Sequence, residues 1–110
     1  MTAREWSQQV EWAIHAPIAL REGIAADTVQ AIAEGRRPRQ MPEDEALLYD
    51  FCIGLHRNRS ISEQAVALWG EYGVMDLVAA NGYYRLLSMV MNAARTEVPA
   101  STARRLPDLP

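Results

Sequence analysis

The sequence contains very little cysteine, and this scarcity limits the chemistry that the chain can perform. Cys52 is the one cysteine among 110 residues, so no disulfide can form within the chain. Proteins without disulfides are typical of reducing compartments, and we therefore predict a cytoplasmic protein. An oxidised Cys52 would also lack a second thiol to resolve it.

The sequence also lacks a large excess of one charge and an uninterrupted apolar run. The formal net charge is −3, which excludes the basic surface expected of a nucleic-acid-binding domain. The first twelve residues, MTAREWSQQVEW, contain two acids and no apolar stretch, unlike a signal peptide. Polar residues interrupt the most apolar stretch, 77–94, at Asn81, Arg85, Ser88 and Asn92. Because a charge inside a membrane is costly, we predict no membrane contact.

The apolar residues recur at helical spacing. Four of them, each four positions apart, define one face of a helix predicted over 3–21: Trp6, Val10, Ile14 and Ile18. Gly23 is suited to end this helix, because glycine adopts the left-handed conformation at low cost. Pro17 is expected to kink the helix just after His15, because proline removes one backbone hydrogen bond.

Four further helices are predicted over 26–34, 42–59, 63–72 and 74–94. Gly73 separates the last two, and the helix over 74–94 is apolar on nearly every face. Such a helix needs cover all round, which predicts a homo-oligomer. The sequence therefore indicates an all-α domain over 1–98. A tail over 99–110, rich in proline and small polar residues, is expected to be extended or disordered.

Glu11 and His15 are the best candidates for chemistry. They lie four residues apart, so they share one helix face and can touch. A carboxylate beside an imidazole orients the ring and selects its tautomer, which is the minimum apparatus for acid–base catalysis. On spacing alone, an exposed helical pair without catalytic function is the favoured interpretation. One imidazole and one carboxylate, with no third ligand, do not predict a metal site.

Cys52 and Arg85 each have two interpretations. His56 follows Cys52 by four residues and could lower the pKa of the thiol, but a small buried apolar residue is the favoured role for Cys52. Arg85 and Tyr84 lie in the apolar helix over 74–94. Arg85 could pair with an acid, possibly on a neighbouring subunit, or bind a substrate carboxylate. The residues alone do not separate these two roles, and we favour the structural one.

Three blocks of the sequence carry spaced motifs. The first follows E-W-x-x-H-x-x-x-A-x-x-x-G and consists of Glu11, Trp12, His15, Ala19 and Gly23. The second follows E-A-x-x-x-x-F-x-x-x-L-H over 45–56. The third follows L-V-x-x-x-G-Y-Y-x-L-x-x-M-x-x-N-A-x-x-x-x-x-P over 77–99. In this order the blocks resemble the C-terminal part of a longer member of the carboxymuconolactone decarboxylase-like family.

This resemblance implies an alkylhydroperoxidase D-like fold of about five helices that assembles into trimers or hexamers. It also implies decarboxylation, or related acid–base chemistry, on a small carboxylated lactone or related acid, without a metal or an organic cofactor. His15 would transfer the proton and Glu11 would orient it. Trp12, Tyr84 and Arg85 would contact the substrate.

The same family includes thiol peroxidases with a C-x-x-C pair four residues before a histidine. With His15 in the histidine place, Gln8 and Glu11 stand where the two cysteines would be, so that motif is absent. Longer members carry a further helical segment before the first block, and we expect the domain over 1–98 to lack it. The alternative to an enzyme is a non-catalytic oligomeric helical protein or truncated remnant, and a peroxidase using Cys52 comes third.

Overall fold

Five helices make up the regular structure of the part of the chain that the structure describes. The computed structural model describes residues 1–60, 62–103 and 105–108, and within these ranges it contains no strand. This confirms the predicted all-α fold of about five helices. The helices are α1 (Thr2–Glu5), α2 (Gln9–Arg21), α3 (Ala26–Ala33), α4 (Glu43–His56) and α5 (Glu63–Ala93).

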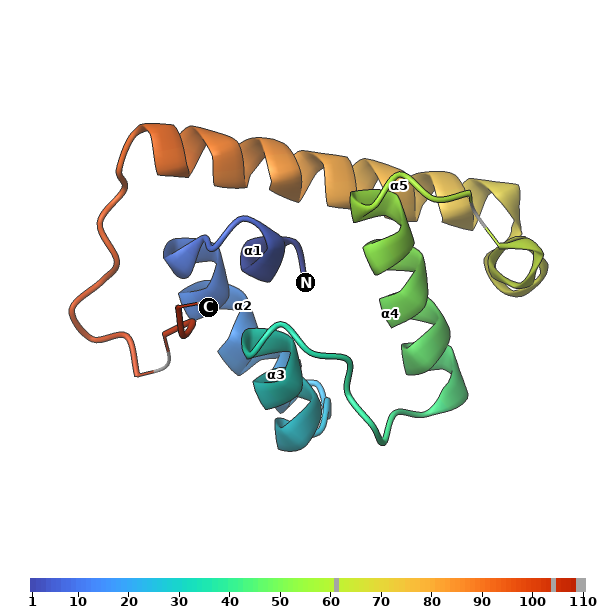
Figure 1. Ribbon diagram of the computed structural model, residues 1–110, viewed down its shortest axis with the longest axis horizontal. Coiled ribbons are helices and arrows are strands. Elements are labelled where there is room, and N and C mark those ends of the chain that lie inside the picture. The colour runs from blue at the N-terminus through green and yellow to red at the C-terminus, as the bar shows by residue number, and fades with distance from the viewer. Residues whose placement is uncertain (61, 104, 109–110) are drawn as a thin grey trace.

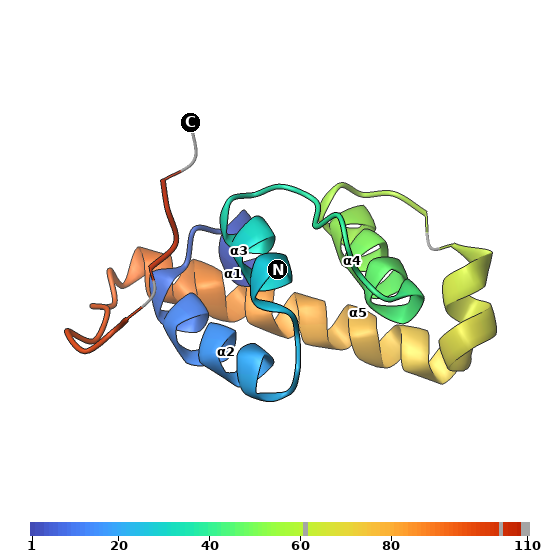
Figure 2. The same cartoon turned by 90° about the horizontal axis from the view of Figure 1, so that it is seen from below.

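The long helix α5 organises the other four. It runs along the long axis of the molecule, with α1, α2 and α3 below its C-terminal half and α4 below its N-terminal half (Figure 1). Both α1 and α4 pack directly on α5, α2 packs on α1, and α3 packs on α2. The view from below shows α1, α2 and α3 grouped together, with α4 apart from them (Figure 2). Within the described ranges, no helix combines the length and apolar character needed to cross a membrane.

The predicted single helix over 3–21 is wrong, because the chain breaks between α1 and α2. Ser7 adopts a left-handed conformation with φ of 48°, which ends α1. The Gln8 side chain then accepts hydrogen bonds from the backbone N–H groups of Val10 and Glu11, and so caps α2. Pro17 lies inside α2 without ending it. A kink at Pro17 stays a prediction.

Each helix ends in the same backbone arrangement. The residue after each C-cap has positive φ: Ser7, Gly23, Gly35, Asn58 and Arg95. At the end of α2, for example, Ile24 N–H donates to the Ala19 carbonyl over 3.0 Å, and Gly23 N–H donates to Leu20. This paired bonding is the Schellman motif, and it satisfies carbonyls that the helix leaves free. The predicted role of Gly23 is confirmed.

The break predicted at Gly73 lies instead at Gly70. Gly70 has φ of 68° and ψ of 173°, so α5 consists of two helical segments, 63–69 and 71–93, joined at a kink. Gly73 is helical, but a Cβ there would lie 2.9 Å from the Trp69 Cβ. Gly70 therefore supplies the bend and Gly73 permits the close approach of the two segments.

Two small clusters of buried side chains form the core. The first joins α2, α3 and the tail, and contains Trp12, Ala16, Val29, Ala33 and Leu106. The second joins α4 and α5, and contains Phe51, Cys52, Ala65 and Val74. Because α1 and α4 both pack on α5, this helix spans the two clusters.

The tail returns to the first cluster instead of leaving the molecule. Leu106 is only 4% exposed, and its backbone N–H and C=O both bond to the Gln9 side chain, over 2.8 and 2.9 Å. The buried Arg4 guanidinium donates to the carbonyls of Ala33 and Pro107. The tail thus covers the ends of α1 and α2.

Leu106→Ala should therefore lower the free energy of unfolding by about 2–5 kcal/mol, the usual range for removing a buried leucine side chain. Leu68→Ala is the matched control, because Leu68 is 54% exposed and should change stability by less than about 0.5 kcal/mol. Urea unfolding measures both values. Equal effects from the two substitutions would show that the tail does not pack on the core.

Candidate functional site

Glu11 and His15 meet on the inner side of α2. The Gln8 cap starts the helix, so Glu11 falls in its first turn and His15 one turn later. The Glu11 carboxylate Oε2 lies 3.2 Å from His15 Nε2. The exposed fractions of the two side chains differ strongly, at 8% for Glu11 and 45% for His15. The pair is therefore not a solvated surface pair, because its acid is withdrawn from water.

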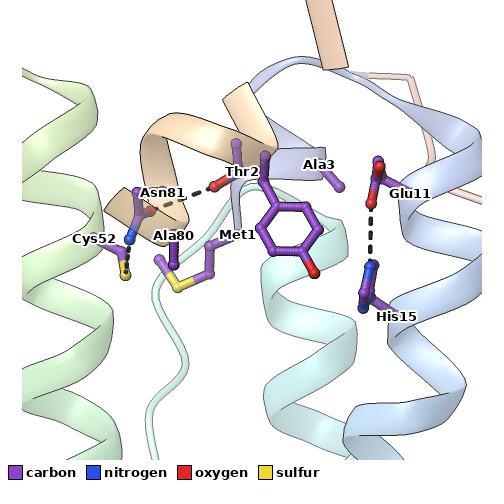
Figure 3. A pocket seen from close by; sticks show the side chains of 9 residues that line it. Met1, Thr2, Ala3, Glu11, His15, Cys52, Ala80 and Asn81 are labelled. Carbon is purple, nitrogen blue, oxygen red and sulfur yellow. Dashed lines mark hydrogen bonds and ion pairs between the residues drawn. The ribbon is translucent and has the colours of Figure 1, made fainter. Parts of the chain in front are cut away.

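This pair lines a cavity of ≈ 260 Å³ at the junction of α1, α2, α4 and α5. Figure 3 shows the Glu11–His15 pair on one wall and Cys52 and Asn81 on the opposite wall. The lining consists of Met1, Thr2, Ala3, Glu11, His15, Cys52, Ala80, Asn81 and Tyr84. His15 is the lining side chain that can carry a positive charge. The cavity therefore combines one acid–base pair with small and neutral groups.

Tyr84 holds the imidazole from the side of α5. The rings of His15 and Tyr84 meet edge to face, with centroids 5.0 Å apart and planes at 86°. Tyr83 packs against Tyr84 in the same manner, with centroids 5.6 Å apart. With Nε2 facing Glu11 and the ring packed against Tyr84, His15 has a defined orientation. The structure thus brings together three of the predicted site residues: Glu11, His15 and Tyr84.

A chain of hydrogen bonds forms the opposite wall. The Thr2 hydroxyl donates to Asn81 Oδ1 over 3.4 Å and lies 3.3 Å from His56 Nε2. The Asn81 amide donates to Cys52 Sγ over 3.4 Å and to the Leu77 carbonyl over 2.8 Å. The N–H and C=O groups of the Asn81 side chain are therefore both hydrogen-bonded within the protein, and these bonds fix the positions of Thr2 and Cys52.

Cys52 has the surroundings of a buried apolar residue. It belongs to the core cluster of α4 and α5, and burial raises the pKa of its thiol, although the Asn81 hydrogen bond acts in the opposite direction. Among the described residues its hydrogen-bond partner is Asn81, whereas the predicted partner His56 contacts Thr2. The thiolate, which is the reactive form of cysteine, is thus disfavoured.

Trp12 lies beside the site and not in the first cavity. It lines a neighbouring cavity of ≈ 240 Å³ between α2, α3 and α4, which shares Met1, Ala3 and His15 with the first. The lining of this second space is largely aliphatic, with Ala16, Val29, Ile32 and Leu48 among its residues. His15 therefore stands between a mixed cavity and an apolar one.

Arg85 does not join the site. Its side chain is exposed, and its guanidinium lies 5.2 Å from the centre of the Trp6 ring. Within one copy of the chain, the aromatic face of Trp6 thus supports the cation at the surface, and pairing of Arg85 with an acid on a neighbouring subunit stays a prediction. Arg85 is also absent from the described lining of both cavities.

Thr2 and Asn81 are site residues that the sequence did not assign to the cavity. Asn81 could have been identified from the sequence, because an amide in an apolar helix needs hydrogen-bond partners. Thr2 carried none, because the break after α1 that brings it to the cavity has no marker in the sequence. Within residues 1–60, 62–103 and 105–108, no three His, Cys, Asp or Glu side chains are grouped as metal ligands would be.

Comparisons of the chain with protein-family models, curated proteins and solved structures found no match. The resemblance to the carboxymuconolactone decarboxylase-like family therefore stays a prediction from the three motif blocks.

His56 should make folding stability depend on pH. Burial lowers the pKa of His56, with an opposing effect of Glu5. The unfolded chain takes up this proton as the pH falls through about 6.5, whereas the folded chain does so only at lower pH. The proton therefore favours unfolding, and the free energy of unfolding decreases as the pH falls from about 7 towards 5.

In His56→Gln this decrease should be smaller than in the wild type, as measured by urea unfolding at several pH values. A decrease of the same size in both proteins would show that His56 is not buried as described.

Proposed function

We propose that this chain performs acid–base chemistry on a small molecule, with His15 as the proton-transferring group and Glu11 as the residue that positions it. One observation carries the proposal: a buried carboxylate lies 3.2 Å from a half-exposed imidazole on the wall of a cavity. Burial of a carboxylate costs free energy unless a partner offsets it. Because helix stability alone does not explain this burial, we assign a function to the contact between Glu11 and His15.

The contact with Glu11 assigns roles to the two ring nitrogens of His15. In the neutral ring with its proton on Nε2, that proton lies on the side of Glu11, and the lone pair of Nδ1 accepts a proton from the substrate. In the protonated ring, Nδ1–H can donate that proton to a carbon or oxygen atom. The 45% exposure of the His15 side chain gives it access to water, which restores the ring to its starting state.

The three motif blocks favour one reaction of this class, the decarboxylation of a small carboxylated lactone or related acid. In that reaction the bond from carbon to the carboxylate breaks, and its electron pair enters the conjugated lactone system as carbon dioxide leaves. The carbon skeleton then takes one proton from the His15 imidazolium, and water supplies the next proton to His15. No oxidant, reductant or cofactor is needed for this balance.

The cavity favours a small substrate. A volume of ≈ 260 Å³ is at the lower end for ligand sites. A substrate carboxylate would be repelled by Glu11 and attracted by protonated His15, so it should bind on the Nδ1 side of the ring. Arg85 contributes no charge to this cavity within one copy of the chain, so we omit it from the proposed mechanism.

The second candidate is a non-catalytic, oligomeric helical protein. It is favoured by the position of Arg85 on Trp6, because Arg85 then offers no guanidinium to a carboxylate in the cavity. It is favoured also by the exposed apolar residues of α5, among them Leu86, Met89 and Val90. A peroxidase using Cys52 has less support, because burial raises the pKa of its thiol.

The test is carbon dioxide release from 4-carboxymuconolactone and from a panel of smaller lactone acids. His15→Ala should lower the turnover rate by about 100- to 10,000-fold, the usual contribution of a positioned acid or base. Glu11→Gln keeps the shape of the side chain but removes its charge, and should lower the rate by about tenfold or more.

Glu34→Gln is the matched control. Glu34 accepts a hydrogen bond from Gln30 at the same four-residue spacing, but on the exposed side of α3. Its substitution should leave the rate unchanged. Wild-type turnover that survives in His15→Ala would remove His15 from the mechanism. Lack of turnover and of ligand-dependent stabilisation across the panel would favour the non-catalytic candidate.

A further inference from the structure

The cavity that Trp12 lines reaches into the core of the molecule. Its volume is ≈ 240 Å³, and its lining residues Trp12, Ala16 and Val29 also belong to the buried cluster of α2, α3 and the tail. Leu48 lines the same cavity from α4. Most of the lining side chains are apolar, and the transfer of an apolar group from water to such a wall is favourable.

Alanine residues leave this second cavity open. Ala3 lines it from α1, and Ala16 and Ala19 line it from α2. A larger side chain at these positions would fill part of the space. Because a cavity of about 150 Å³ is enough for a benzene molecule, a volume of ≈ 240 Å³ holds an apolar group of about six carbon atoms.

The charge around the second cavity disfavours a bound anion. Glu45 is the acidic side chain of its described lining, and no described cation forms an ion pair with it. The hydroxyl groups of Thr28 and Tyr49 add polar but neutral atoms. In the first cavity, by contrast, the acid Glu11 is paired with His15. A carboxylate should therefore bind in the first cavity and an apolar group in the second.

The two cavities meet at His15. Ala3 and His15 line both of them, and the imidazole contacts Glu11 through its Nε2 atom. His15 is thus positioned to contact the reactive group of a molecule whose apolar part fills the second cavity. An apolar space with a few polar groups at one end is the usual form of a small-molecule site.

We propose that the substrate of this chain is amphiphilic: its acid or lactone group lies at His15, and an apolar group of about six carbon atoms occupies the second cavity. The inference rests on the proposed function for the reaction, but the binding of the apolar group does not require turnover. Ala19 and Leu48 are then specificity-determining residues. Ala19 leaves space for the apolar group, and Leu48 keeps the wall apolar.

Calorimetric titration of the full chain with linear carboxylates, from butanoate to octanoate, tests this binding mode. Each added methylene group should lower the Kd by about fourfold until the second cavity is filled. His15→Gln should raise the Kd of every member by a similar factor, because it changes only the partner of the carboxylate. Equal Kd values for butanoate and octanoate would overturn the inference.

Two variants place the alkyl chain in the second cavity. Leu48→Gln makes the wall polar and should raise the Kd of octanoate by about tenfold, with little effect on butanoate. Leu48 is 38% exposed, so the fold should tolerate this change. Ala19→Leu fills the space and should raise the Kd of octanoate by at least about fivefold.

Leu47→Gln is the matched control for Leu48→Gln. Leu47 adjoins Leu48 on α4 but is absent from the described lining of both cavities, so its substitution should leave the Kd of octanoate unchanged. Equal effects of Leu47→Gln and Leu48→Gln would place the alkyl chain outside the second cavity and overturn the inference.

Turnover and binding distinguish this inference from the proposed function. If no lactone acid releases carbon dioxide but Leu48→Gln abolishes the chain-length dependence, the proposed reaction fails and the apolar subsite is supported. If turnover depends on His15 but binding does not depend on chain length, the proposed function is supported and the amphiphilic substrate is overturned.

Discussion

The arrangement of this molecule depends on the burial of the Glu11 carboxylate. Withdrawal of a carboxylate from water is costly, and two features offset that cost here. The break at Ser7 and Gln8 places Glu11 in the first turn of α2, where the positive end of the helix dipole favours an acid. His15 then supplies an ion-pairing partner, with its Nε2 atom 3.2 Å from the carboxylate. A single long helix over 3–21 would have left Glu11 in mid-helix, without the first of these contributions.

The same break explains where the cavity lies. It directs α1 under α5 and brings Thr2 to Asn81, so that the gap between the two core clusters is lined on both walls. Because α5 contacts both halves of the molecule, its inner side presents Asn81 and Tyr84 to this gap.

The sequence predicted the all-α class and the pairing of Glu11 with His15. The predictions that were wrong failed for physical reasons. The spacing of Glu11 and His15 indicated their contact, but spacing does not report burial, which separates this pair from an exposed one. Ser7 is a poor marker of a helix end, so the break after α1 was missed. Gly70 and Gly73 are equally able to bend a chain, and in the structure Gly70 makes the bend whereas Gly73 leaves room for Trp69. The apolar neighbours of Arg85 in the sequence do not indicate on which side of α5 it lies, and in the structure the Trp6 ring supports its side chain at the surface.

A double-mutant cycle tests the central claim, that Glu11 and His15 form a withdrawn pair and not a solvated one. The free energies of unfolding of the wild type, Glu11→Gln, His15→Gln and the double variant give the coupling between the two side chains. The buried carboxylate predicts a favourable coupling of about 1 kcal/mol or more, as for hydrogen bonds that involve a charged group. A coupling below about 0.5 kcal/mol, typical of exposed pairs four residues apart on a helix, would contradict the account.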